Sequence, residues 1–364
     1  MEESYLKDAI NLALVKRVLV IKLRHHGDVL LTSPVFSALA SKKPDIEIDA
    51  LVYAETSPML EDHPAISKIH RIDRKWKKQG ITTQWREERK LMTALQNRHY
   101  DLIIHLTESA RGSRLVRRLR PRYSVAQAYP EKRGRTWRST FTHTYQLPDK
   151  PRHMVEVHLD ALRRLGIYPA QQERRLVLNP GPDAEQFADK LLTEHGLEPG
   201  GYILVHPTSR WMFKGWSVDG FAKVINGLAG KGYKLILTSA PDQAELSTVS
   251  KIVGALNGDG VIDIAGQTDL KQLAALIDRA ACFIGLDSVP MHIAAAMDTP
   301  CVALFGPSND QKWGPWMVNH RVISAAATCR PCELDGCGNG KVSDCLMSIP
   351  ADQVIAAAET LLKS

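Results

Sequence analysis

Short runs of β-branched and other apolar residues alternate with longer helical patterns along the whole chain. The apolar runs of the first half are residues 17–23, 46–53, 66–72 and 101–106, and those of the second half are residues 202–207, 233–239, 260–266, 281–287 and 300–306. Three segments between the later runs, at 217–232, 242–258 and 269–281, carry apolar residues at helical spacing. This alternation is typical of parallel sheets covered by helices, so it predicts an α/β fold.

A segment rich in Pro and Gly, Val177–Glu185, interrupts this alternation near the middle of the chain. With 364 residues, the chain is long enough for two domains that each bury a core. We therefore expect two doubly wound Rossmann-like domains, residues 1–178 and 179–350, facing a central cleft. Residues 351–364 are expected to form a C-terminal helix that packs back toward the N-terminal domain.

The composition is that of a globular protein, with 44% hydrophobic and 24% charged residues. No apolar run approaches the roughly 18 residues of a membrane span. The first residues, MEESYLKDAINLALVK, begin acidic and contain no continuous apolar block, so we expect no secretory signal and a cytoplasmic location. In that compartment cysteines are thiols or metal ligands more often than disulfides.

Four of the six cysteines lie close together, at Cys329, Cys332, Cys337 and Cys345. Their spacing allows a structural zinc site, although it is shorter than that of common zinc modules. The alternative is that they are free thiols in a loop. The residues alone leave both interpretations open.

Positive charge is concentrated in one part of the chain. The formal charge is +7, and between Arg111 and Arg138 there are nine arginines and one lysine but a single acid, Glu131. Residues 111–120 resemble a short basic amphipathic helix that ends before Pro121. Such a helix is either a solvated face or a docking surface for an anionic partner. No known nucleic-acid motif accompanies it, so we expect no nucleic-acid partner.

Polar residues follow the apolar runs where strands of a parallel sheet would end. They are His25, His26, Gly27 and Asp28 after the first run, and Thr208, Ser209, Lys214, Asp242, Asp287, Ser288 and His292 in the second half. Ligands of doubly wound sheets bind at these carboxyl ends. Hydroxyls, a lysine and the start of a helix suit a phosphorylated ligand, because free backbone amides at a helix start can hold a phosphate.

Simpler explanations exist for some of these residues. Ser288 and Pro290 are a natural N-cap and first-turn pair, and Asp28 could cap a helix that begins near Val29. Trp211 and its aromatic neighbours could fill a seam between domains instead of contacting a ligand. No glycine-rich lysine loop, G-x-G-x-x-G motif or Asp-x-Asp pair occurs, which argues against a nucleotide hydrolase, a typical dehydrogenase and a metal-bridged diphosphate.

The motifs VLVIKLRHHGDVLLTSPVFSAL, HPTSRWMFKGWS, TSAPDQAE and FIGLDSVPMHIAAAMDTPCVALFGPSND, in this order, resemble the ADP-heptose:lipopolysaccharide heptosyltransferases. The resemblance covers nearly the whole chain and is strongest to the heptosyltransferase III group. It implies a GT-B glycosyltransferase that works by inversion and without a metal or other cofactor. The implied reaction adds the branching third heptose, from ADP-L-glycero-β-D-manno-heptose, to the second heptose of the lipopolysaccharide inner core.

The resemblance also implies a role for each site residue. Asp28 corresponds to the catalytic base, in an acceptor-binding N-terminal domain. The donor contacts in the C-terminal domain carry over to Thr208, Ser209 and Lys214 at the diphosphate, to Asp242 at the ribose in place of a Glu, and to Asp287, Ser288 and His292 at the diphosphate and sugar. Gly27, His25, His26, Arg114, Arg117 and Arg118 are candidate acceptor contacts, the arginines also facing the anionic inner membrane.

Alternative functions remain open on the sequence. Heptosyltransferases I and II of the same pathway share these motifs. A GT-B enzyme that uses another nucleotide sugar is also compatible, because nothing in the motifs specifies adenine or heptose chemically. The basic helix alone would equally suit a non-catalytic binder of polyanions. We expect a monomer that associates peripherally with the cytoplasmic face of the inner membrane.

Overall fold

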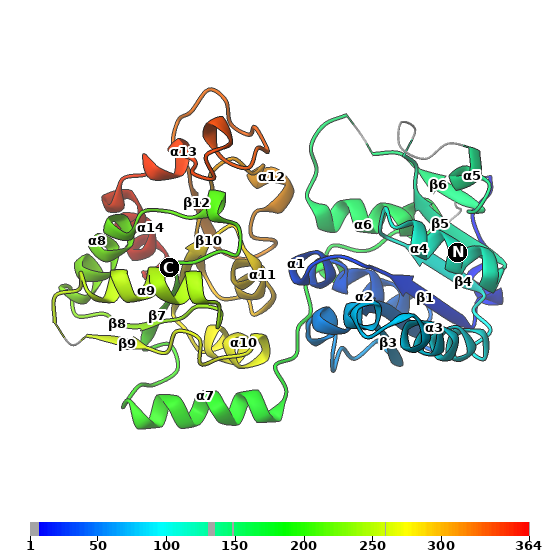
Figure 1. Cartoon of the computed structure of the whole chain (residues 1–364), viewed down its shortest axis with the longest axis horizontal. Coiled ribbons are helices and arrows are strands. Elements are labelled where there is room, and N and C mark those ends of the chain that lie inside the picture. Colours follow the sequence, from blue (N-terminus) through cyan, green and yellow to red (C-terminus); the bar gives the residue numbers. More distant parts are fainter. Residues whose placement is uncertain (1–6, 130–134, 148, 259, 364) are drawn as a thin grey trace. The chain divides into compact units, whose positions relative to one another are not determined.

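The chain forms two six-stranded parallel sheets, one in each half (Figure 1). A computed structural model describes residues 7–129, 135–147, 149–258 and 260–363. Its contacts divide the chain into two units, residues 1–178 and 179–364. The GT-B fold class that the sequence predicts is confirmed, because each unit is a doubly wound sheet with flanking helices.

In the first unit the strand order is β3-β2-β1-β4-β5-β6. The strands are β1 (Arg17–Ile21), β2 (Glu47–Tyr53), β3 (Lys68–Ile72), β4 (Leu102–His105), β5 (Tyr123–Gln127) and β6 (His143–Tyr145). The helices are α1 (His26–Leu30), α2 (Ser33–Lys42), α3 (Ile81–Gln96), α4 (Ala110–Leu119), α5 (Arg135–Arg138) and α6 (Met154–Arg163), with short 3₁₀ turns at Leu12–Leu14, Ala54–Met59, Arg74–Lys78 and Gln172–Arg174. The order reverses between β1 and β4, which is where such sheets bind ligands.

The second unit repeats this arrangement, in the order β12-β11-β10-β7-β8-β9. Its strands are β7 (Tyr202–His206), β8 (Lys234–Leu237), β9 (Val261–Asp263), β10 (Cys282–Leu286), β11 (Cys301–Leu304) and β12 (His320–Ile323). Its helices are α7 (Pro182–Glu194), α8 (Val218–Ala229), α9 (Gln243–Val253), α10 (Leu270–Asp278), α11 (Val289–Ala296), α12 (Asp310–Trp313), α13 (Asp344–Met347) and α14 (Ala351–Leu362), with 3₁₀ turns at Met212–Lys214 and Cys337–Asn339. The reversal lies between β7 and β10.

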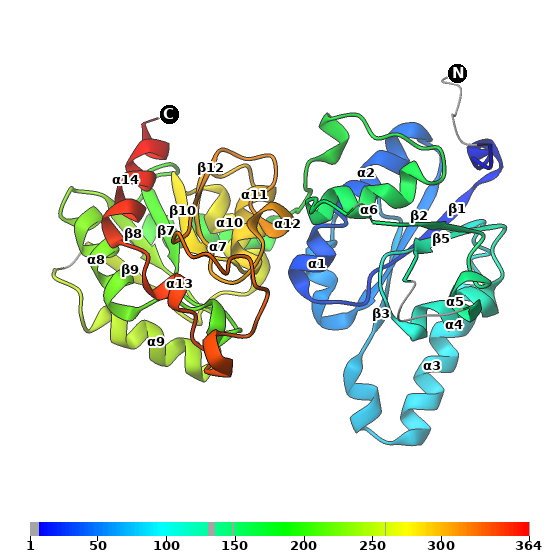
Figure 2. The ribbon, with the colours of Figure 1, turned by 90° about the horizontal axis from the view of Figure 1, so that it is seen from above.

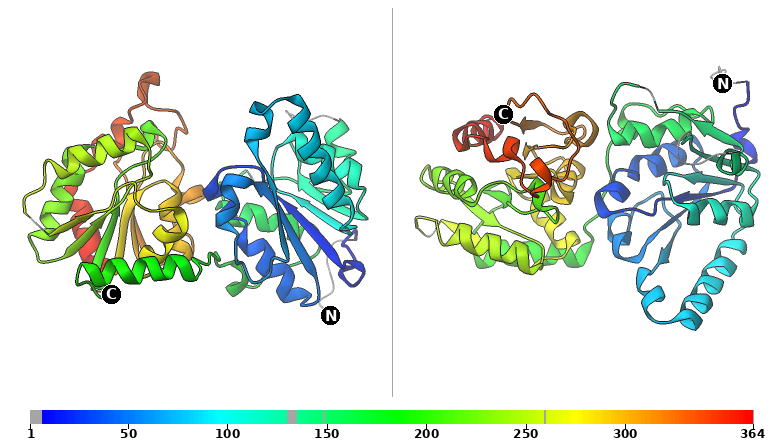
Figure 3. Two further views of the ribbon diagram at one scale, coloured as in Figure 1. Left: turned by 60° about the horizontal axis from the view of Figure 1, so that its bottom comes forward. Right: turned by 45° about the horizontal axis from the view of Figure 1, so that its top comes forward.

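The central strands of both sheets are apolar because helices cover both of their faces (Figure 3). In β1, residues Val18 to Ile21 are all buried, and Leu19 and Ile21 belong to the core of the first unit. In the second unit Val205, Ile284 and Leu304 occupy the corresponding core. Trp216 also belongs to this core and packs edge-on against Phe221, so it is a structural aromatic residue.

The C-terminal helix belongs to the core of the second unit. Helix α14 packs against α8 and against β10, β11 and β12 (Figure 2). The reason is its apolar face: Val354, Ala358 and Leu361 are buried in the core of the second unit.

Candidate active site

Asp28 lies at the strand reversal of the first unit, in the short helix α1 that follows β1. Gly27 is buried beside it, and its main chain continues the turn from the strand into the helix. Helix α1 begins at His26, with His25 at the N-cap position, so Asp28 occupies the first turn. The expectation that Asp28 caps a helix starting near Val29 is therefore wrong.

The carboxylate of Asp28 faces a buried cation. Oδ1 of Asp28 lies 3.6 Å from Nζ of Lys22, the residue that directly follows β1. The Asp28 side chain is 19% exposed, whereas that of Lys22 is 5% exposed. The Asp28 carboxylate is thus partly accessible to solvent and contacts Lys22 on its buried side. This arrangement suits a group that exchanges a proton with a bound hydroxyl.

The two histidines before Asp28 differ in their surroundings. The His26 ring makes a hydrogen bond through Nε2 to the carbonyl oxygen of Glu55, at 2.7 Å. This bond ties the start of α1 to the 3₁₀ turn at Ala54–Met59. His25 is exposed at the helix start. His26 therefore supports the loop that carries Asp28.

In the second unit the expected donor residues gather at the ends of the neighbouring strands β7 and β10. Nζ of Lys214 forms an ion pair with Oδ2 of Asp287 at 2.6 Å. An ammonium group has three N–H donors, so this pair leaves Lys214 able to donate to an anion as well. Ser209, just after β7, accepts a hydrogen bond through Oγ from the main chain of Trp211.

Helix α11 begins directly after β10. Ser288 occupies its N-cap position without a side-chain capping bond, and its Oγ lies 3.4 Å from the carbonyl oxygen of Leu286. The capping explanation for Ser288 is therefore not the one the structure supports. His292 is buried on this helix, one turn after Ser288. The hydroxyl and the first amides of α11 lie at the sheet edge beside Asp287.

The strand β8 ends next to β7, and α9 follows it. Two acids lie at the start of this helix: Asp242, which the sequence predicts as a site residue, and Glu245, which it does not. Asp242 caps α9 by accepting hydrogen bonds through Oδ1 from the main chains of Ala244 and Glu245. The buried Glu245 accepts a short hydrogen bond, 2.6 Å, from Oγ1 of Thr208. An acid three residues after a capping Asp is a recognisable helix-start pattern. That pattern alone does not reveal the contact with Thr208.

The expected basic helix exists as α4. Arg114, Arg117 and Arg118 are exposed on it, while Leu115 and Val116 pack into the core of the first unit. Arg111 pairs with Glu88 of α3 at 3.1 Å and so connects the two helices. The arginines form a separate charged face of the first unit.

The cysteine cluster shows no metal geometry. Among the described residues, no group of three or more His, Cys, Asp or Glu side chains is arranged to hold a metal ion. None of Cys329, Cys332, Cys337 and Cys345 forms a disulfide.

Each unit thus carries its polar side chains at the carboxyl ends of the central strands, a carboxylate in one and a lysine, hydroxyls and a helix start in the other. With the paired Rossmann-like sheets, these features define a glycosyltransferase of the GT-B class. The chain belongs to glycosyltransferase family 9 (heptosyltransferase), whose family model matches residues 88–343.

Relatives and solved structures agree with this class. Lipopolysaccharide heptosyltransferase 3 of Escherichia coli K12 is 36% identical over 341 residues, which cover 93% of this chain and 96% of that protein. Lipopolysaccharide core heptosyltransferase OpsX of Haemophilus influenzae is 26% identical over 309 residues, covering 85% and 84%. The crystal structure of a family 9 glycosyltransferase from Veillonella parvula superposes with a TM-score of 0.82, at 25% identity, over 98% of this chain and 99% of that one. The structure of E. coli heptosyltransferase WaaC with ADP superposes at 0.75, at 21% identity, over 95% and 99%, and shows the shared fold.

Proposed function

We propose that the chain transfers heptose from ADP-L-glycero-β-D-manno-heptose to the second heptose of the lipopolysaccharide inner core, as the branching third heptose. The observation that carries this proposal is the similarity to E. coli lipopolysaccharide heptosyltransferase 3, which extends over 93% of the chain. Transfer of another core heptose is the second candidate, because the chain is also similar to the core heptosyltransferase OpsX, at a lower identity of 26%.

The proposed chemistry is a single displacement. The Asp28 carboxylate accepts the proton of an acceptor hydroxyl, whose oxygen forms a bond to the anomeric carbon of the heptose. The bond from that carbon to the ADP oxygen breaks, and the electron pair leaves with ADP. Attack from the side opposite the leaving group inverts the anomeric configuration. Gly27 and His25 are the proposed neighbours of the acceptor hydroxyl, and His26 holds their loop.

The second unit is proposed to hold the departing ADP. Lys214 neutralises the diphosphate, and Ser209, Ser288 and the first amides of α11 donate hydrogen bonds to it. Thr208, whose Oγ1 donates to Glu245, adjoins Ser209 at this end of β7. Asp242 has one carboxylate oxygen engaged in capping α9, which leaves Oδ2 to accept from a ribose hydroxyl.

The two remaining residues proposed to contact the donor are Asp287 and His292. Asp287 orients Lys214 through their ion pair. His292 is proposed to reach the diphosphate or the sugar from the second turn of α11. None of these steps draws on a metal or another cofactor.

A transfer assay tests the proposal. Purified protein is incubated with ADP-heptose and with core acceptors that end after the first, second or third heptose, and the products are weighed by mass spectrometry. We expect a gain of one heptose only on the acceptor that carries two heptoses and lacks the branch. Transfer to an acceptor with one heptose, or with none, would assign the chain to another step, and a donor panel would reveal a different nucleotide sugar.

We further propose that the protein works as a monomer bound to the cytoplasmic face of the inner membrane. No helix of the described residues is long and apolar enough to cross a bilayer. Ile81 and Trp85 lie one turn apart on α3 and are 86% and 64% exposed. The Arg89 guanidinium lies over the Trp85 ring, 5.3 Å from its centroid.

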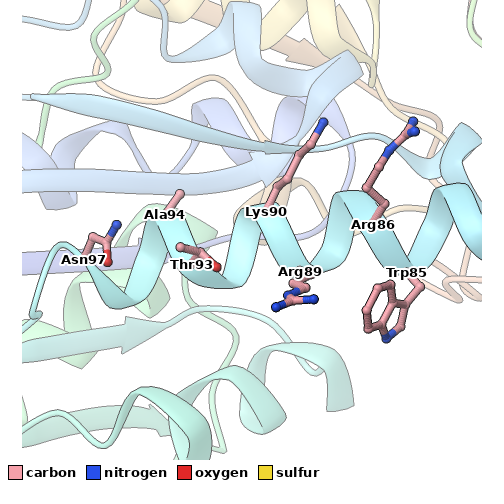
Figure 4. Close-up of a pocket in the computed structure, with 7 residues that line it drawn as sticks. All are labelled: Trp85, Arg86, Arg89, Lys90, Thr93, Ala94 and Asn97. Carbon is pink, nitrogen blue, oxygen red and sulfur yellow. The ribbon is translucent and has the colours of Figure 1, made fainter.

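Helix α3 also carries a shallow pocket lined by Trp85, Arg86, Arg89 and Lys90 (Figure 4). Trp85 and Arg89 point to one side of the helix, and Arg86 and Lys90 to the other. The adjoining α4 supplies three exposed arginines. Exposed Trp and Ile among cations match an anionic lipid surface, where the rings enter the headgroup layer and the cations face phosphates.

Sedimentation with lipid vesicles tests this surface. We expect binding to phosphatidylglycerol vesicles, weaker binding to phosphatidylcholine, and loss of binding in an Ile81→Ser, Trp85→Ser double variant. Leu334→Ser, which removes an exposed apolar side chain of the second unit, is the matched control. Equal binding of the double variant and the control would exclude α3 from the contact.

A further inference from the structure

Lys22 is a buried cation that none of the steps above uses. It follows β1 directly and is 4% exposed. Its Nζ donates to the carbonyl oxygen of Leu106 at 3.1 Å and contacts Nε2 of His158 at 2.9 Å. The third neighbour is Oδ1 of Asp28 at 3.6 Å. Two of the three N–H groups of the ammonium thus have hydrogen-bond acceptors, and the third faces the Asp28 carboxylate at a longer distance.

The hydrogen bonds of His158 fix the proton on its ring. Nδ1 lies 3.0 Å from the carbonyl oxygen of Leu31, which can only accept, so Nδ1 carries the proton and donates. Nε2 then presents its lone pair to Lys22. Burial and the Lys22 charge lower the pKa of His158 well below its usual value, which keeps the ring neutral. His158 is thus a fixed acceptor, anchored in α6 and bound to the end of α1.

Neighbouring carboxylates only partly offset the effect of burial on the pKa of Lys22. Burial lowers its pKa to about 8, with a smaller lowering from Arg24, while Asp28 and Glu108 act in the opposite direction. Near neutral pH the ammonium form therefore predominates. His153 also lowers the pKa of His158. The position of Lys22 is set by Leu106 and His158, so the Asp28 carboxylate faces a charge that cannot move away.

We propose that Lys22, held by His158 and the Leu106 carbonyl, is a positioning residue for Asp28. By attracting Oδ1, it orients the carboxylate so that Oδ2 accepts the proton of the acceptor hydroxyl. This inference rests on the proposed role of Asp28 and adds to it an orienting pair from β1 and α6.

The first test is Lys22→Met, which keeps the chain length and removes the charge. We expect kcat to fall roughly 10²-fold, the effect of misplacing a reacting group by about 1 Å. The affinity for ADP should stay unchanged, because the proposed ADP contacts belong to the second unit.

A matched pair at His158 separates positioning from packing. In His158→Gln the amide oxygen can replace Nε2 as an acceptor for Lys22, whereas His158→Leu offers none. We expect His158→Leu to lose kcat with unchanged ADP affinity, as Lys22→Met does, and His158→Gln to retain more of its kcat. If Lys22→Met fails to fold, as judged by circular dichroism, this pair carries the test.

The Asp28→Asn background distinguishes the two proposals. If Asp28→Asn is nearly as active as the unmodified protein, the proposed base is wrong. If Asp28→Asn is inactive while Lys22→Met keeps normal kcat, the positioning role of Lys22 is wrong. Equal activity of His158→Leu and His158→Gln also overturns it. The positioning account expects Lys22→Met to cost little in the Asp28→Asn background, because the group it orients is already disabled.

Discussion

Replacing Asp28 with Asn removes the proton acceptor and changes little else. The two side chains have nearly the same size, and α1 takes no side-chain cap from Asp28 because the helix begins at His26. The amide oxygen can still accept from Lys22, 3.6 Å from the present Oδ1. We expect a stability loss below about 1 kcal/mol. For a unit of this size, the melting temperature should fall by no more than about 4 °C.

The loss of activity should be far larger. Removal of a general base lowers turnover by roughly 10²–10⁴-fold. That factor corresponds to about 3–5 kcal/mol in the activation barrier, at roughly 1.4 kcal/mol for each factor of ten. ADP binding should be unaffected, because Lys214 and Asp287 belong to the second unit.

The assay combines three measurements on one preparation: heptose transfer by mass spectrometry, ADP affinity by calorimetry, and thermal unfolding by circular dichroism. We expect kcat to fall while the affinity for ADP and the melting temperature stay unchanged. Turnover within a few-fold of the unmodified protein would refute the assignment of Asp28 as base. A comparable loss of ADP affinity would mean that Asp28 acts on the donor.

Other perturbations give distinct outcomes. Lys214→Met should weaken ADP binding about 10-fold to 100-fold in calorimetry, because a charged hydrogen bond contributes about 1.5–3 kcal/mol; unchanged affinity would remove Lys214 from the site. Leu361→Ala should cost about 2–5 kcal/mol in urea unfolding, and the exposed Gln353→Ala less than about 0.5 kcal/mol; equal effects would contradict the packing of α14. Replacing Arg114, Arg117 and Arg118 with Gln should raise the acceptor KM and leave the donor KM unchanged; an unchanged acceptor KM would make them a solvated face.

The stability of the protein should also depend on pH in a defined window. Burial lowers the pKa of His63 and of His206 from 6.5 to about 4. Below pH 6.5 the unfolded chain binds protons at these rings, whereas the folded chain does so only near pH 4. Stability should therefore fall as pH decreases from 6.5 to 4 and be constant in this respect above 6.5. Melting curves across this range check the prediction; a melting temperature independent of pH would contradict it.

The sequence predicts the central strands well because they are apolar on both faces. Strands β5, β6 and β12 escape such prediction, since β5 reads YSVAQ and the edge strand β6 has only three residues. β6 is held beside β5 partly by hydrogen bonds between Ser124 and Thr142. These contacts join residues far apart in sequence, so no local sequence pattern predicts them.

The candidate site is likewise predicted only in part from the sequence. Strand ends locate Asp28, Thr208 and Asp287 from the sequence alone, because the parallel strands of each sheet all end at the same edge of that sheet. The partners of these residues come from elsewhere: His158 lies on α6 and Glu245 on α9. Which side chain meets which depends on packing between elements, and the sequence does not encode that locally.

The most direct test of the proposed function is the mass of the core oligosaccharide from a strain that lacks this protein. The account predicts loss of one heptose, the branch on the second heptose, with the rest of the inner core intact. Restoration by the unmodified chain but not by Asp28→Asn would tie that heptose to the proposed base. A core truncated before the second heptose, or one that keeps its branch, would contradict the account.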